Sequence, residues 1–156
     1  MNEDEMLIKL FQQFKKFAVL GISQTWQRPS NFVGKYILNH GYTVYPVNPN
    51  YKSVLGQSCF QSLSEIPHCV EVVICFRRPD SLSQLVPELL EKNVKVLWLQ
   101  FGVINKQLKT EAESKGIRVI MDRCIKIEHA RLFGGLNFMG VNTKVITSKR
   151  SRIVFN

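Results

Sequence analysis

The chain alternates short continuous apolar runs with longer segments in which apolar residues recur every three or four positions. A continuous run is typical of a strand buried on both faces, and the longer period is typical of an amphipathic helix. Five runs predict strands, at residues 17–22, 42–47, 70–76, 94–100 and 117–121. Because crossovers of helix length separate them, we predict a doubly wound α/β fold: a Rossmann-like five-stranded parallel sheet in the order 3-2-1-4-5.

Helical spacing predicts helices at residues 3–16, 29–39 and 81–92. A further helix is predicted from a cap at Asn105 to Lys115, ended by Gly116. We expect residues 1–133 to form one domain with an N-terminal helix, and residues 134–156 to form a basic C-terminal extension. That extension has only weak strand propensity, at Val145 and Ile146.

The charge is unevenly spread along the 156 residues. The net charge is +9, and the segment 122–156, with seven basic and two acidic side chains, supplies five of the nine. A basic balance favours a polyanionic ligand, nucleic acid or an acidic surface, without choosing among them. The longest apolar runs are far shorter than the ~20 residues of a membrane helix, and the first five residues include three acidic ones, unlike a secretory signal. We therefore expect a soluble, cytoplasmic protein with no membrane partner.

The cysteines and histidines show no metal-ligand spacing. Cys59, Cys69, Cys75 and Cys124 include no C-x-x-C pair, and the three histidines form no pattern with them. We expect four free thiols in a reducing compartment and no metal site.

The candidate chemistry lies just after the predicted strands, because open parallel sheets bind ligands beyond the carboxyl ends of their strands. After the first strand, Gly21 permits a tight turn, Ser23 and Thr25 offer hydroxyl donors, and Arg28 offers a cation. Pro29 suits the first position of a helix, whose N-terminus can hold a phosphate. The alternative is an ordinary strand-to-helix turn capped by Ser30.

This first loop differs from the dinucleotide fingerprint G-x-G-x-x-G. Ser23 and Trp26 occupy the positions of the second and third glycines, and no acidic residue follows the second strand, where Asn48 stands. These differences argue against NAD or NADP. The motif G-x-x-x-x-G-K-[ST] is also absent, which disfavours a mononucleotide hydrolase.

Arginines follow the other strands. Arg77, Arg78 and Arg123 are expected on the same rim as Arg28, and guanidinium groups match phosphate geometry. The alternative for any one of them is an ion pair with Asp80, Asp122 or Glu128.

Four segments, 47–49, 76–79, 98–102 and above all 121–132, closely resemble the small stand-alone CoA-binding proteins. Those proteins resemble the N-terminal CoA-binding domain of the succinyl-CoA synthetase α subunit. The resemblance covers roughly residues 5–133. It implies CoA or acyl-CoA as the ligand, held along the strand ends.

The resemblance also implies where each part of the ligand lies. Phosphates are expected at the turn after the first strand, the adenosine end beside the second strand, and the pantetheine arm beside the third and fourth. With Arg28 and Ser30 from the first loop, the expected binding residues are Gly21, Ser23, Gln24, Arg28, Ser30, Val47, Asn48, Pro49, Lys52, Phe76, Arg77, Leu99, Gln100 and Phe101.

The expected function is non-catalytic binding of CoA or acyl-CoA. The synthetases form a phosphohistidine on a second domain, for which this chain has no room, and His129 does not match that histidine. The alternatives are an enzyme that uses Cys124, Asp122 or His129 on an acyl thioester, and a nucleic-acid binder. The latter would use Lys144, Lys149, Arg150 and Arg152, but only Phe155 follows that cluster, which leaves little surface for base stacking.

Overall fold

The computed structural model describes residues 1–77, 82 and 84–134. They belong to two compact units: residues 14–124 form one, and residues 1–13 with the segment from 125 onward form the other. Val145 and Ile146, with their weak strand propensity, lie outside the described residues, as does the basic cluster of the C-terminal extension. Within the described part of the chain, no helix is long and apolar enough to cross a membrane.

The larger unit contains a five-stranded sheet in which every strand pair is parallel. Its strands are β1 (Lys16–Leu20), β2 (Thr43–Val47), β5 (Val72–Cys75), β6 (Val96–Leu99) and β7 (Arg118–Met121). The predicted parallel α/β fold is confirmed. The predicted order is wrong: the sheet runs β2-β1-β5-β6-β7, so the third long strand pairs with the first and not with the second.

Pro46 provides the physical reason for this order. Its carbonyl accepts from the N–H of Phe60 (2.9 Å) on the outer side of β2, whereas the carbonyl of Val47 accepts from the N–H of Gly21 (2.9 Å) on the β1 side. The N–H that proline lacks would also have pointed outward. A neighbouring strand on that side would miss a ladder hydrogen bond, so β2 suits an edge of the sheet.

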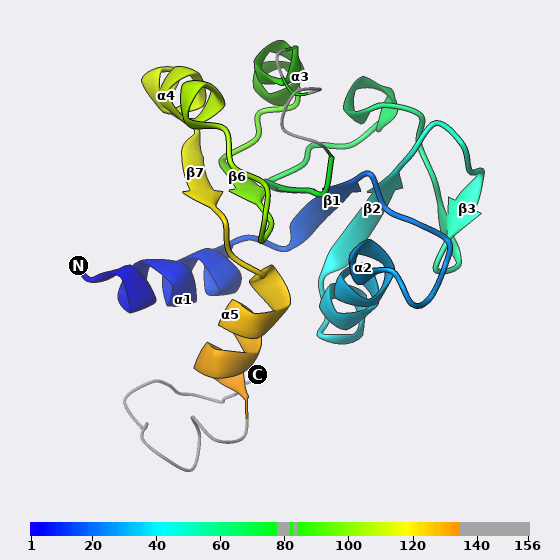
Figure 1. Ribbon diagram of the computed structural model, residues 1–156, viewed down its shortest axis with the longest axis horizontal. Helices are drawn as coiled ribbons and strands as arrows, with labels where there is room; N and C mark the ends of the chain where they lie inside the picture. The colour runs from blue at the N-terminus through cyan, green and yellow to red at the C-terminus, as the bar shows by residue number, and fades with distance from the viewer. Residues whose placement is uncertain (78–81, 83, 135–156) are drawn as a thin grey trace. The chain divides into compact units, whose positions relative to one another are not determined.

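Helices cover both faces of this sheet. Figure 1 shows α3 (Leu85–Glu91) and α4 (Lys106–Ser114) on one face and α2 (Pro29–Asn39) on the other. The predicted bounds of α2 are confirmed, and α3 is shorter than the predicted 81–92. The predicted cap of α4 is also confirmed, because the side chain of Asn105 accepts from the N–H of Leu108 at 2.9 Å.

A small hairpin between β2 and β5 was not predicted. Its strands are β3 (Ser53–Val54) and β4 (Gln57–Ser58), and the 3-10 helix η1 (Leu63–Glu65) follows. The turn residues Leu55 and Gly56 both have positive φ, 56° and 73°. Such values at both central positions are typical of a tight two-residue hairpin turn. Two-residue strands are too short to show an alternating apolar pattern.

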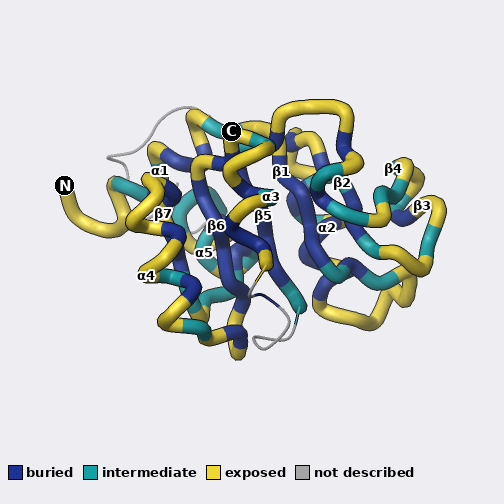
Figure 2. The backbone as a smooth tube through the Cα atoms, turned by 90° about the horizontal axis from the view of Figure 1, so that it is seen from above, coloured by how far each residue is buried: buried dark blue, intermediate teal, exposed yellow. Residues whose placement is uncertain are grey.

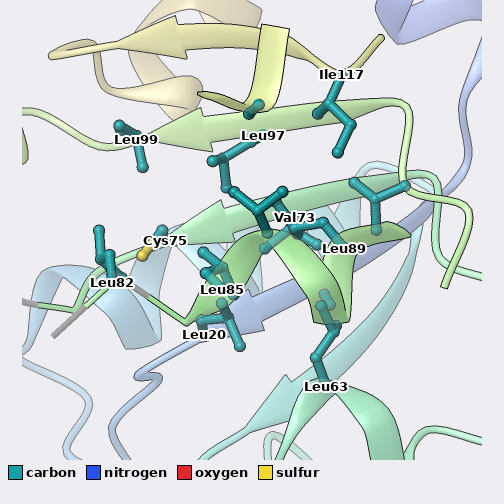
Figure 3. Packing of buried hydrophobic residues seen from close by; sticks show 14 of the residues in the cluster. Leu20, Leu63, Val73, Cys75, Leu82, Leu85, Leu89, Leu97, Leu99 and Ile117 are labelled. Atoms are coloured by element: carbon teal, nitrogen blue, oxygen red, sulfur yellow. The ribbon is translucent and has the colours of Figure 1, made fainter. Parts of the chain in front are cut away.

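The central strands are buried along their length, whereas the loops that join them are mostly exposed (Figure 2). On one face, Leu20, Val73 and Leu97 of the sheet pack in one cluster with Leu85 and Leu89 of α3 (Figure 3). Cys75 belongs to the same cluster. Burial raises the pKa of the Cys75 thiol to about 11, while the nearby Arg77 acts in the opposite direction. This thiol therefore stays neutral at physiological pH, and all four cysteines are free.

In the smaller unit, the described helices are α1 (Glu3–Gln13) and α5 (Ile125–Phe133). The predicted helix extended to Lys16, so α1 is shorter than predicted. Phe11 of α1 meets the ring of His129 edge-on, with centroids 4.9 Å apart, and also contacts Phe133 at 5.9 Å. Arg131 forms a forked ion pair with Asp4 (3.0 and 2.8 Å). His129 is thus a buried packing residue between two aromatic rings.

Candidate functional site

The strand order defines where the two halves of the sheet diverge. From β1 the chain crosses to β2 on one side, and the next long strand, β5, lies on the other side of β1. In open parallel sheets, ligands bind at the carboxyl ends of the strands beside this switch point. The relevant loops are therefore those that follow β1 and β5, with the ends of β2 and β6 on either side.

Gly21 and Arg77 meet at the switch point. Gly21 follows β1 with φ of 82°, and a Cβ at this position would lie 3.4 Å from the Cγ of Arg77 and 3.5 Å from its backbone nitrogen. The N–H of Phe76 donates to the carbonyl of Leu20 (3.0 Å), and the N–H of Gly21 donates to that of Val47 (2.9 Å). Main-chain bonds thus join Gly21 to Val47 and hold Phe76 at the end of β1, and Arg77 lies beside Gly21.

The loop between β1 and α2 is folded by its own hydroxyl groups. The N–H of Ser23 donates to Oγ of Ser30 (2.9 Å), and the N–H of Thr25 donates to Oγ of Ser23 (3.0 Å). Both hydroxyl oxygens therefore accept from the backbone, which leaves each hydroxyl proton to donate elsewhere. The alternative interpretation of Ser30 as a helix cap is wrong, because the cap position of α2 is Arg28, which makes no side-chain cap bond.

Two amide side chains anchor this loop to its neighbours. Nε2 of Gln24 donates to the carbonyl of Ser53 at the start of β3 (2.9 Å). Nδ2 of Asn48 donates to the carbonyl of Ile22 (2.8 Å), while its Oδ1 accepts from the N–H of Asn50 (2.9 Å). Asn48, where a dinucleotide-binding protein would carry an acid, thus joins the end of β2 to the loop after β1.

The remaining predicted residues differ in exposure. The side chains of Val47 and Leu99 are fully buried in the core, so only their main chains could meet a ligand; Gln100 is also buried. Pro49, Lys52 and Phe101 are exposed. The structure therefore divides the predicted set into core residues that shape the edge and exposed residues that could contact a ligand.

The guanidinium groups of Arg28 and Arg77 form no ion pair with any acidic side chain in the described part of the chain. Arg123 follows β7, and its carbonyl accepts from Nε1 of the buried Trp98 (2.8 Å). Arg78 and Asp80 lie outside the described residues. Among the residues that are described, no group of three or more His, Cys, Asp or Glu side chains could hold a metal ion.

Sequence reasoning missed two residues that support the loop. Asn31, only 5% exposed, donates from Nδ2 to the carbonyl of Ser23 at 2.7 Å. A Cβ on Gly34 would lie 2.9 Å from Cδ1 of Ile22 and 3.2 Å from Cδ1 of Leu55, so glycine allows α2 to pack closely here. The available signal was a polar residue and a glycine three positions apart in the first two turns of α2.

Comparisons with known proteins identify the family of this chain. The CoA binding domain family matches residues 15–130, and this chain belongs to that family. The uncharacterized protein YneT of Bacillus subtilis (strain 168) is 38% identical over 122 residues, which cover 78% of this chain and 90% of YneT. A solved hypothetical protein from Pyrococcus horikoshii OT3 superposes with a TM-score of 0.82 at 38% identity, covering 85% of this chain and 94% of that one.

Longer relatives contain a similar segment. The ADP-forming acetate–CoA ligase I of Archaeoglobus fulgidus is 25% identical over 151 residues, which cover 90% of this chain and 21% of the ligase. This chain therefore spans about a fifth of that relative. The predicted membership of the small CoA-binding proteins is confirmed, and the longer relatives are ADP-forming acetate–CoA ligases.

Proposed function

We propose that this chain binds CoA or acyl-CoA, without transforming it, at the carboxyl ends of β1, β2, β5 and β6. The observation that carries the proposal is the proximity of Gly21 and Arg77 at the switch point, where a Cβ on Gly21 would touch Arg77. Arg77 thus lies beside the turn that leads to the N-terminus of α2, where a phosphate can be held, and its guanidinium group has no acidic partner among the described residues. Membership of the CoA binding domain family supports the same ligand.

The phosphates of CoA would lie against the loop after β1. Arg77 and Arg28 would supply charge-assisted hydrogen bonds, which are worth about 1.5–3 kcal/mol each. The hydroxyl protons of Ser23 and Ser30 would add neutral donors, since their oxygens already accept from the backbone. The amides of Gln24 and of Asn48 would act by holding the loop in shape.

The rest of the ligand would follow the sheet edge in both directions. Pro49 and the exposed Lys52, after β2, would lie beside the adenosine end. Phe76 after β5 and Phe101 after β6 would flank the pantetheine arm. Val47, Leu99 and Gln100 would contribute through the backbone positions that their buried side chains fix.

The experiment is calorimetric titration of the full chain with CoA, with NAD as the matched control. CoA should bind and NAD should not, because Ser23 replaces a glycine of the fingerprint and Asn48 replaces the ribose-binding acid. Tighter binding of NAD than of CoA would overturn the proposal. Native mass spectrometry of the purified protein would show in addition whether CoA or an acyl-CoA copurifies.

The non-catalytic part of the proposal needs its own measurement. His129 is buried between the rings of Phe11 and Phe133, which supports a packing role. Incubation of the chain with acetyl-CoA should release no free thiol above the rate without protein. Sustained thiol release that is lost in Cys124→Ser would favour the alternative of an enzyme acting on the thioester.

A further inference from the structure

The loop between β6 and α4 presents an aromatic ring on a fixed turn. The N–H of Val103 donates to the carbonyl of Gln100 (2.8 Å), which closes a four-residue turn. Gly102 has φ of 87°, a value that a type II turn requires at its third position. Gln100 and Val103 at the ends of the turn are buried, whereas Phe101 at its tip is 78% exposed and Ile104, just beyond, is 48% exposed.

Asp122 holds this turn from the neighbouring strand. It follows β7 with φ of 62°, and its Oδ1 accepts from the N–H of Gly102 at 2.8 Å. Its own N–H donates to the carbonyl of Leu99 at 2.9 Å. The positive φ is uncommon outside glycine, although Asp and Asn tolerate it best. The turn is therefore tied at both ends and at its middle, and the exposure of Phe101 follows from a defined backbone.

Nothing in the packing of the turn calls for an aromatic residue at its tip. Type II turns favour proline at the position of Phe101. Phe101 and Ile104 are exposed apolar residues of one loop, which follows β6, and β6 pairs with β5, the strand that leads to Arg77. A ligand whose phosphates lie at Arg77 would reach this loop with the part that is farther from the phosphates.

We infer that Phe101 and Ile104 form an apolar platform for the acyl group of an acyl-CoA, so that the chain prefers thioesters of short apolar acids to free CoA. Asp122 is the positioning residue of this platform, because it acts through Gly102 on the direction of Phe101. The inference rests on the proposed function and adds the class of ligand that the site selects.

The test compares the affinities of CoA, acetyl-CoA and butyryl-CoA for the full chain by calorimetric titration. Burial of apolar surface predicts roughly two- to fourfold tighter binding for each added methylene, with butyryl-CoA the tightest of the three. Ile104→Ser should reduce this preference while leaving CoA affinity within about twofold. Leu90→Ser is the matched control: Leu90 on α3 is 42% exposed, and its replacement should leave the preference unchanged.

Variants of Asp122 separate positioning from general stability. Asp122→Asn keeps an oxygen that can accept from Gly102 and should retain the ratio of butyryl-CoA to CoA affinity. Asp122→Ala should lower that ratio by roughly threefold or more, and circular dichroism at the titration temperature would verify folding. Equal affinities for CoA and butyryl-CoA in the unmodified chain would overturn this inference alone. Failure to bind CoA or any thioester would overturn the proposed function, and this inference with it.

Discussion

The side-chain amide of Asn31 in the first turn of α2 donates to the carbonyl of Ser23 at 2.7 Å. This bond ties the helix back to the loop that follows β1, and Asn31 is only 5% exposed. A loop that is held in this way keeps its hydroxyl groups in place before a ligand arrives, which lowers the entropy cost of binding.

Replacing Asn31 should therefore affect both stability and binding. Asn31→Ala leaves the carbonyl of Ser23 without this partner, which typically costs about 1–3 kcal/mol of unfolding free energy. We expect this loss in urea denaturation and weaker CoA binding in calorimetry. Asn39→Ala, at an exposed position in the last turn of the same helix, should change the unfolding free energy by less than about 0.5 kcal/mol. Equal behaviour of the two variants would mean that the bond does not organise the loop.

The arginines at the sheet edge should matter more to binding than the basic residues of the C-terminal extension. Arg77→Ala or Arg28→Ala should weaken CoA binding roughly tenfold or more, since one charge-assisted bond exceeds the 1.4 kcal/mol that equals a factor of ten. The double variant Lys149→Ala/Arg150→Ala should change affinity by less than about threefold, because charges that do not contact the phosphates are screened over ~8 Å at physiological salt. Calorimetric titration of the folded variants with CoA measures these effects. A larger loss of affinity in the double variant than in either single arginine variant would mean that the site lies elsewhere.

The buried thiol of Cys75 should make stability depend on pH in the alkaline range. Its pKa is raised by burial from an ordinary value of 9.0 to about 11, so the unfolded chain loses this proton first as pH rises. The stabilising contribution is fully present below pH 9 and is lost between pH 9 and 11; at pH 10 the loss is about 1.4 kcal/mol. Cys75→Val removes this contribution.

Denaturation of both proteins from pH 8 to pH 10 measures that contribution. The unfolding free energy of the unmodified chain should fall by about 1.4 kcal/mol more than that of Cys75→Val. Other titrating groups, such as the tyrosines, are common to both proteins and cancel in the difference. If the unfolding free energies of the two proteins fell equally with pH, the contribution could not be assigned to Cys75.

In the smaller unit, packing should outweigh the ion pair. Phe11 is 1% exposed and contacts His129 and Phe133, so Phe11→Ala should cost about 3–5 kcal/mol of unfolding free energy. Asp4→Ala removes a partner of Arg131 in an ion pair whose side chains are about half exposed, and should cost about 1 kcal/mol or less. Thermal denaturation of the two variants compares their losses of stability. A larger loss for Asp4→Ala than for Phe11→Ala would contradict the dominance of packing.

The apolar runs predicted all five long strands because buried parallel strands need almost no polar positions. The predicted order of the strands was wrong because an apolar pattern indicates which strands are buried but not which strands pair with each other. The one local signal was Pro46: a residue without an N–H inside an apolar run indicates an edge strand. The sequence contained this information, and the prediction of β2 as an interior strand did not use it.

The residues that directly follow the strands could be predicted as site residues, because the carboxyl ends of parallel strands lie at one edge of the sheet. Gly21 and Arg77 were expected on one rim and do lie side by side. The bonds of Asn31 to Ser23 and of Asp122 to Gly102 were not predictable, because each joins residues whose proximity depends on how helix and loop pack. An amide or carboxylate side chain has no periodic signature, and its partner is apparent only in three dimensions.

The pairing of Phe60 with β2 has a consequence for self-association. The N–H of Phe60 donates to the carbonyl of Pro46, and its carbonyl accepts from the N–H of Asn48 at 2.8 Å, so the outward main-chain groups at this end of β2 are already satisfied. An open strand edge is a template on which a second chain can add and begin a fibre. Here proline removes one donor and Phe60 occupies the adjacent groups, so a second copy could extend the sheet past this end of β2 only by first displacing Phe60.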